Sequence, residues 1–194
     1  MNKRILVTGG TGYIGSHTVV ELQNSGYEVV IIDNLSNSRA DVVDNIEKVS
    51  GVRPIFEQLD CLDYAGLDAL FAKYDNIKGI IHFAASKAVG ESVEKPLMYY
   101  RNNLVSLINL LELMPKYGVE GIIFSSSCTV YGQPDILPVT EAAPTKVAES
   151  PYGNTKQINE EIIRDYVKSG APVNAILLRY FNPIGAHPSA MIGE

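Results

Sequence analysis

The chain has 194 residues, of which 46% are hydrophobic and 20% charged, and its formal net charge is −6. This length and composition are typical of a globular domain that buries its own core without a disulfide or a metal ion. The acidic balance argues against nucleic acid or an anionic membrane surface as a partner.

Short β-branched runs alternate with longer helical patterns along the chain. In chain order, the predicted strands are residues 4–8, 28–32, 53–58, 79–83, 121–125 and 173–179, and the predicted helices are 13–25, 41–49, 64–74, 97–114 and 151–168. This alternation predicts an α/β fold with a doubly wound, Rossmann-like parallel sheet. The segment 131–150 carries three prolines and fits neither pattern. Loops of this length are usually functional.

Targeting and metal-binding signals are weak. Cys61 and Cys128 are too few for a disulfide framework, and the three histidines lie far from them without ligand-like spacing. The apolar run Ile5-Leu6-Val7 is too short for a signal-peptide core, and no apolar stretch approaches the length of a membrane span. We therefore expect a cytoplasmic protein with neither a metal site nor a membrane partner.

A glycine-rich turn follows the first predicted strand. Its glycines fit both G-x-x-G-x-x-G and G-x-G-x-x-G: Gly9, Gly10, Gly12 and Gly15. Such a turn brings backbone N–H groups and a helix N-terminus to a pyrophosphate. Asp33 follows about 20 residues later, where a carboxylate accepts hydrogen bonds from ribose hydroxyls and repels a 2′-phosphate. The pattern predicts NAD rather than NADP, with Arg39 as the nearby cation that argues the other way.

Polar residues after two later strands admit two interpretations each. Asp60 can face an adenine amino group, or it can serve as a turn or N-cap residue. Ser125, Ser126 and Ser127 offer a hydroxyl to a reacting oxygen, or they satisfy backbone groups at the strand end. The neighbouring Cys128 has no histidine in a partner position, which favours a packed thiol over a nucleophile.

Two tyrosine–lysine pairs have the spacing Y-x-x-x-K. Tyr152 and Lys156 share one face if the helix 151–168 forms. An ammonium about 5 Å from the phenol would favour the phenolate by roughly 3 kcal/mol, which prepares a tyrosine to take a proton near neutral pH. Tyr74 and Lys78 instead precede a strand, at the edge opposite to the one where ligands bind. We therefore predict that only the first pair is catalytic.

Six segments together resemble the extended short-chain dehydrogenase/reductase superfamily and, within it, the UDP-glucose 4-epimerase family. They are VTGGTGYIGSHTVVE (7–21), DNLSNS (33–38), IHFAASKAVGES (81–92), SSSCTVYG (125–132), PYGNTK (151–156) and RYFNPIGAHP (179–188). The resemblance implies NAD-dependent epimerisation at C4 of a UDP-hexose, interconverting UDP-glucose and UDP-galactose. Hydride passes transiently to bound NAD, and a 4-keto sugar is the intermediate.

The resemblance also implies roles for individual residues. Tyr152 removes the 4-hydroxyl proton, Lys156 binds the nicotinamide ribose and lowers the tyrosine pKa, and Ser127 holds the sugar oxygen. Cofactor contacts are implied for Gly9, Gly12, Tyr13, Ile14, Gly15, Asp33, Asn34, Leu35, Ser36, Asn37, Ser38, Asp60, Cys61, Phe83, Ala84, Ala85, Lys87, Asn102, Tyr152, Lys156 and Tyr180. Substrate contacts are implied for Lys87, Ser127, Tyr152, Phe181 and Asn182. Cys61 and Cys128 depart from the residues usual in the family.

By the same resemblance, residues 1–180 form an NAD-binding domain, and 181–194 begin a truncated substrate-binding region. The smaller C-terminal domain of the family is then missing. An alternative is an NAD-binding fragment without turnover, which lacks the binding energy that positions the sugar. A sugar-nucleotide 4,6-dehydratase is another alternative. It is disfavoured because that family has an Asp-Glu pair where this chain has Cys128-Thr129.

The predicted helix 97–114 is apolar on nearly every side, which is typical of a helix buried on two faces. One face can pack on the sheet. The resemblance implies that the other meets a second copy in a homodimer, whereas burial within one chain or under the missing domain is the alternative.

Overall fold

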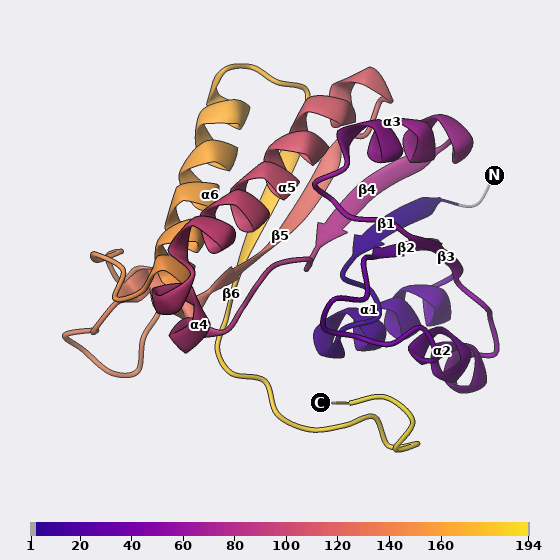
Figure 1. Cartoon of the computed structure of the whole chain (residues 1–194), viewed down its shortest axis with the longest axis horizontal. Helices are drawn as coiled ribbons and strands as arrows, with labels where there is room; N and C mark the ends of the chain where they lie inside the picture. Colours follow the sequence, from indigo (N-terminus) through magenta and orange to yellow (C-terminus); the bar gives the residue numbers. More distant parts are fainter. Residues whose placement is uncertain (1–2, 194) are drawn as a thin grey trace.

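The computed structural model describes residues 3–193, which form one six-stranded parallel sheet in the order β3-β2-β1-β4-β5-β6 (Figure 1). The strands are β1 Arg4–Thr8, β2 Glu28–Asp33, β3 Ile55–Gln58, β4 Ile77–His82, β5 Gly121–Ser127 and β6 Asn174–Tyr180. The helices are α1 Tyr13–Asn24, α2 Val42–Ser50, α3 Tyr64–Lys73, α4 Val89–Glu94, α5 Pro96–Lys116 and α6 Pro151–Lys168, with a 3₁₀ turn η1 at Cys128–Tyr131. The predicted doubly wound α/β fold is confirmed.

Helices cover both faces of the sheet (Figure 1). Helices α3, α5 and α6 pack on one face over the larger core cluster, which includes Leu6, Ile80 and Phe124. Helices α1 and α2 pack on the other face over Val7 and Ile31. The strand order reverses between β1 and β4, so the chain leaves these two strands in opposite directions. Their carboxyl ends therefore open into the crevice where α/β folds bind ligands.

The second face is covered over only part of its width. Ala175 and Leu177 of β6 pack against the larger core, so the alternation of a strand turns Ile176 and Leu178 to the opposite face. These two side chains are 55% and 39% exposed. After β6 the chain crosses towards α1, where Ile192 joins the smaller core cluster (Figure 1).

The structure differs from the predicted elements mainly at their ends. Helix α4 was not predicted, because its six residues are too few to show a helical period. Strand β5 continues through the serines to Ser127, which pairs with Tyr180, since a neighbouring strand overrides their low strand propensity. Strand β4 begins at Ile77 rather than 79, and helix α5 accommodates Pro115 in its last turn.

Helix α6 has strong signals at its start. Pro151 occupies the first turn, and the Ser150 side chain accepts a hydrogen bond from the Gly153 backbone N–H at 3.1 Å. Both features stabilise a helix N-terminus, and they place Tyr152 in the first turn.

Replacing Gly15 with alanine should destabilise the fold. A Cβ there would meet the Gly9 carbonyl oxygen and lie 2.8 Å from the Gly10 Cα, both of which are backbone atoms. We expect urea unfolding to show a loss of about 3 kcal/mol in the free energy of unfolding, although alanine favours a helix. Gly90→Ala in α4 is the matched control, because nothing lies within 4 Å of its Cβ position. Equal stability of the two variants would contradict the packing argument.

Candidate functional site

The glycine turn forms a backbone cradle between β1, α1 and the loop after β4. Gly9 has a φ of +69°, and a Cβ there would lie 2.8 Å from the Ala84 backbone N. Gly12 is the N-cap of α1, and no described side chain caps this helix. The first turn also contains no acidic residue. The N-terminus of α1, with Tyr13 and Ile14, therefore presents backbone N–H groups and a partial positive charge that suit an anion.

Asp33 lies against this cradle, as its spacing predicted. One of its carboxylate oxygens accepts hydrogen bonds from the Leu35 backbone N–H at 2.9 Å and from the Ser38 hydroxyl at 3.0 Å. The other lies 3.4 Å from the Thr11 backbone N. The Thr11 and Ser38 hydroxyls are also hydrogen-bonded, at 2.8 Å. Thr11 was not singled out from the sequence, although it lies inside the glycine motif.

The remaining residues of the loop after β2 lie on the surface. Asn34, Ser36 and Asn37 are exposed. The Arg39 guanidinium pairs with the Asp41 carboxylate at 2.8 Å. The cation that argued for a 2′-phosphate therefore has an acidic partner of its own.

Asp60 serves as a turn residue. Its carboxylate accepts hydrogen bonds from the Leu62 backbone N–H at 2.8 Å and from the Asn34 side-chain amide at 2.9 Å. These contacts support the structural interpretation. The adjacent Cys61 is buried, and burial raises the pKa of its thiol to about 12, so it stays protonated.

Helix α5 holds the loop after β4 in place. The Asn103 side chain accepts a hydrogen bond from the Ser86 backbone N–H at 2.8 Å and donates one to the Ser86 carbonyl at 3.0 Å. Asn102 donates to the Ser86 hydroxyl at 3.1 Å. The loop includes Phe83, Ala84, Ala85 and Lys87, of which Lys87 is exposed. The rings of Phe83 and Tyr180 lie 6.3 Å apart, which brings the ends of β4 and β6 together.

Tyr152 and Ser127 meet between α6 and the end of β5. The Ser127 side chain lies close enough to Tyr152 to lower the pKa of its phenol, and its hydroxyl accepts a hydrogen bond from the Thr129 backbone N–H at 3.2 Å. The other two serines face elsewhere. The Ser126 hydroxyl bonds Glu160 at 2.5 Å, and Ser125 offers its carbonyl to Lys156. Of the three candidate hydroxyls, the structure brings Ser127 to the tyrosine.

Lys156 is buried directly beneath this pair. Its side-chain nitrogen lies 5.8 Å from the centroid of the Tyr152 ring, 5.0 Å from that of Phe124 and 2.7 Å from the Ser125 carbonyl. Burial lowers the pKa of Lys156 to about 8. The lysine nitrogen thus lies beside the tyrosine ring, as the shared helix face predicts.

The pKa of Tyr152 differs from the sequence expectation. Burial raises it above the ordinary value, and the hydrogen bond from Ser127 lowers it by less than burial raises it. The predicted depression by Lys156 assumed an effective dielectric constant of about 20 between the ammonium and the phenol. Desolvation acts against both charged forms instead.

His82 is a buried neighbour that the sequence analysis did not single out. Its ring nitrogen Nδ1 lies 2.7 Å from the Thr8 hydroxyl at the end of β1. Burial, reinforced by the Lys156 charge, lowers the pKa of His82 to about 3, so the ring is neutral. A neutral ring adds no second positive charge beside Lys156.

The predicted substrate residues beyond β6 lie on the surface. Phe181 is 56% exposed, and its ring stacks on that of Tyr131 at 6.5 Å. Asn182 is exposed. Neither residue is enclosed by the site in the described part of the chain.

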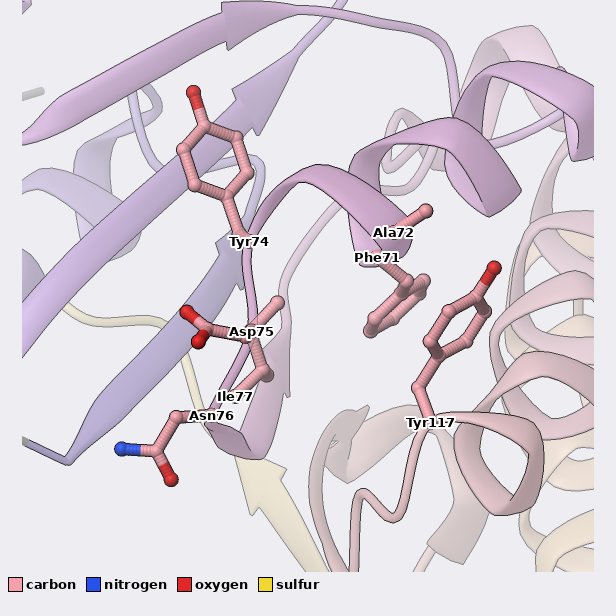
Figure 2. Close-up of a pocket in the computed structure, with 7 residues that line it drawn as sticks. All are labelled: Phe71, Ala72, Tyr74, Asp75, Asn76, Ile77 and Tyr117. Carbon is pink, nitrogen blue, oxygen red and sulfur yellow. The ribbon is translucent and has the colours of Figure 1, made fainter.

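The second Y-x-x-x-K pair lies at the other edge of the sheet. A hollow of about 230 Å³ lies beside the start of β4. Figure 2 shows that the Tyr74 ring points away from Phe71 and Tyr117. The Tyr74 hydroxyl donates to Glu57, and the Lys73 side-chain nitrogen lies 5.0 Å from its ring centroid. Lys78 is exposed. This position, away from the carboxyl ends of the strands, agrees with the sequence prediction.

Within residues 3–193, no group of His, Cys, Asp and Glu side chains is arranged to hold a metal ion. In the same residues, no helix is both long and apolar enough to cross a membrane.

Several known proteins similar to this chain belong to one family of enzymes. The model of the NAD dependent epimerase/dehydratase family matches residues 5–193. A UDP-glucose 4-epimerase of Schizosaccharomyces pombe is 55% identical over 98% of this chain and 54% of its own length. That of Bacillus subtilis is 54% identical over 98% of this chain and 56% of its own length. The chain thus spans little more than half the length of these relatives.

Solved structures agree. The UDP-glucose 4-epimerase from Bifidobacterium longum, in complex with NAD+ and UDP, matches 99% of this chain and 57% of its own, with 47% identity and a TM-score of 0.96. The UDP-glucose 4-epimerase from Stenotrophomonas maltophila, with bound NAD and formylated UDP-arabinopyranose, matches 100% of this chain and 57% of its own. The identity is 48% and the TM-score is 0.95.

The burial of Lys156 predicts a pH dependence of stability. Its pKa is about 8 in the fold and 10.5 ordinarily, so between these values the unfolded chain binds more protons and stability rises with pH. From about pH 7 to about pH 9.5, the free energy of unfolding should rise by about 2 kcal/mol relative to Lys156→Met. Urea unfolding measures this difference. Lys168→Met, at the exposed end of α6, is the control and should follow the unaltered chain. If the free energies of unfolding of Lys156→Met and of the unaltered chain changed equally with pH, the prediction would be contradicted.

Proposed function

This chain belongs to the NAD dependent epimerase/dehydratase family, and we propose that it binds NAD and epimerises a UDP-hexose at C4, interconverting UDP-glucose and UDP-galactose. One observation carries the proposal. The Ser127 side chain lies beside Tyr152, and the nitrogen of the buried Lys156 lies 5.8 Å from the Tyr152 ring centroid, at the same edge of the sheet as the glycine cradle. The related proteins from Schizosaccharomyces pombe and Bacillus subtilis, named UDP-glucose 4-epimerases, support this choice of reaction.

The cradle fits a dinucleotide. A Cβ at Gly9 or Gly15 would collide with backbone atoms, so the turn allows a closer approach than other residues permit. We propose that the backbone around Gly12 holds the pyrophosphate and that Asp33 accepts hydrogen bonds from the adenosine ribose. When bound, NAD supplies a reversible acceptor for hydride from C4 of the sugar.

Side chains of this protein carry out the proton transfer. Tyr152 takes the proton of the 4-hydroxyl at its phenolic oxygen, and Ser127 holds the sugar oxygen by a hydrogen bond. The Lys156 ammonium, once it shares its donors with a nicotinamide ribose, favours the phenolate by its positive charge. We further assign substrate contacts to Lys87, Phe181 and Asn182.

A second candidate is an NAD-binding fragment without turnover. The exposure of Phe181 favours it, because this position directly after β6 lacks a cover within residues 3–193. In either case, we assign residues 1–180 to NAD binding and 181–194 to the start of a substrate-binding region.

Dehydration is disfavoured, since Cys128-Thr129 offers no acidic pair. The free thiols Cys61 and Cys128 support a cytoplasmic location.

We also propose a homodimer. Helices α4 and α5 expose apolar side chains that one chain does not bury: Val89, Val93, Leu97, Met98, Val105 and Ile108. The opposite face of α5 packs in the core through Leu107 and Leu110. Residues 3–193 leave this face uncovered, so the alternative to a second copy is burial under the smaller domain of the family. An isologous contact between two copies would cover it.

The function is tested in two steps on the purified chain. First, the small molecules released on denaturation are identified by absorbance and mass, and we expect NAD. Asp33→Ala should lower NAD affinity about 10-fold, because hydrogen bonds to a charged group are lost. Second, conversion of UDP-galactose to UDP-glucose is measured. Tyr152→Phe should lower kcat about 100-fold or more.

Tyr74→Phe is the matched control for the second step, because it removes the hydroxyl of the other Y-x-x-x-K pair and should leave kcat unchanged. Bound NAD without turnover would favour the fragment. Absence of NAD affinity would contradict both candidates.

The dimer is tested by light scattering at micromolar concentration. We expect a dimer mass for the unaltered chain and a monomer mass for the double variant Val105→Glu, Ile108→Glu, because two carboxylates would be desolvated in the contact. Val147→Glu, at a side chain 90% exposed in the loop before α6, is the control. A monomer mass for the unaltered chain rules the proposal out.

A further inference from the structure

A buried carboxylate, that of Glu160, joins helix α6 to the two strands beneath it. One of its oxygens accepts hydrogen bonds from the Ser126 hydroxyl at 2.5 Å and from Nε of Arg179 at 2.9 Å. The other accepts from the Arg179 guanidinium at 2.8 Å and from that of Arg164 at 2.6 Å. The side chain is only 1% exposed. A charge so buried requires partners of this kind.

The carboxylate is held in its charged form. Burial raises the pKa of Glu160, but the hydrogen bonds from Arg179 and Ser126, together with the positive charges of Arg179 and Arg164, outweigh burial and keep the pKa below its ordinary value. Its bonds are therefore charge-assisted, which makes them shorter and more directional than neutral ones. Such bonds define a distance between α6 and the strands more tightly than apolar packing does.

Glu160 lies on the same face of α6 as the proposed catalytic residues. Tyr152, Lys156 and Glu160 follow one another at intervals of four, so they line up along the helix. Lys156 binds the Ser125 carbonyl, and Glu160 binds the side chain of the next residue, Ser126. The helix thus contacts β5 at two consecutive residues immediately before Ser127.

The same carboxylate also reaches the segment after Ser127. Arg179, which Glu160 binds through two nitrogens, lies over the Tyr131 ring at 4.7 Å. Tyr131 ends η1, and Ser127 caps the start of that turn. Ser127 is therefore fixed from both sides, through Ser126 before it and through η1 after it.

We propose that Glu160 is a positioning residue that sets the separation between the Ser127 hydroxyl on β5 and the Tyr152 phenol on α6. This inference rests on the function proposed for those two residues and adds a specific role for the buried ion pair beneath them. If Glu160 only stabilised the fold, loss of its hydrogen bonds would lower the melting temperature without changing the contact between Ser127 and Tyr152.

Ser126→Ala tests the proposal with a small change. It removes only the bond to β5, while Arg179 and Arg164 still neutralise the carboxylate. We expect kcat for UDP-galactose to fall about 10-fold, with KM and NAD affinity within about twofold, because the sugar still binds but the acid–base pair is misaligned. Glu160→Gln should produce a loss at least as large.

Arg164→Gln is the matched control. It removes an ion pair to the same carboxylate from a side chain that is 52% exposed. We expect it to leave kcat within about twofold, since it touches neither strand. Melting temperatures of all three variants identify any that fail to fold.

A second measurement does not require turnover. The charged or titratable groups near Tyr152 are Lys156 on its own helix, Cys128 of η1 and Tyr99 of α5, with the Ser127 hydroxyl beside them. Ser127 lowers the pKa of Tyr152, so its displacement raises that pKa. Ultraviolet difference titration of each variant against the same variant carrying Tyr152→Phe isolates this group.

An upward shift in Ser126→Ala, with none in Arg164→Gln, supports the positioning role. An unchanged Tyr152 titration in Ser126→Ala and Glu160→Gln overturns it, as does an equal shift in Arg164→Gln. If the unaltered chain shows no turnover of UDP-galactose, the proposed function fails, and the titration still decides the role of Glu160.

Discussion

The structure depends on one close approach of backbone to backbone, where β1 turns into α1 beside the loop after β4. Gly9 lies where a side chain would collide with Ala84, and Gly15 lies where one would collide with Gly9 itself. Because these positions lack side chains, α1 can begin directly at the end of β1 and Asp33 can reach the Thr11 backbone. The helix end proposed to bind the pyrophosphate and the carboxylate proposed to bind the ribose therefore lie together.

A second set of contacts fixes the chemistry on the other side of the crevice. Helix α6 carries two buried charged groups towards the sheet, an arrangement that costs desolvation energy and requires compensating partners. Lys156 has a carbonyl and an aromatic ring, and Glu160 has two guanidinium groups and a hydroxyl. These partners belong to β5 and β6, except for Arg164 on α6 itself. The helix that presents Tyr152 is thus held at a defined height above Ser127.

Burial also decides the charge states around the tyrosine. The pKa of Lys156 falls to about 8 and that of His82 to about 3, while that of Tyr152 rises. The phenol is therefore protonated, above a lysine that releases its proton more easily than one in water. A ligand that supplies hydrogen-bond acceptors to Lys156 would stabilise its charge and thereby favour the phenolate. In the proposed function, cofactor binding and acid–base chemistry would be coupled by this arrangement.

The sequence by itself determined the six strands, five of the helices, the glycine cradle with Asp33, and the placement of Tyr152 and Lys156 at the edge of the sheet opposite to Tyr74 and Lys78. These features depend on local periodicity, on glycine geometry and on chain order, which are all present in one dimension. Only the tertiary structure decided which of three serines meets the tyrosine, that Asp60 closes a turn, and which way the tyrosine pKa moves. Those outcomes depend on packing between segments distant in the chain, because burial and hydrogen-bond partners exist only once α6 lies on β5 and β6.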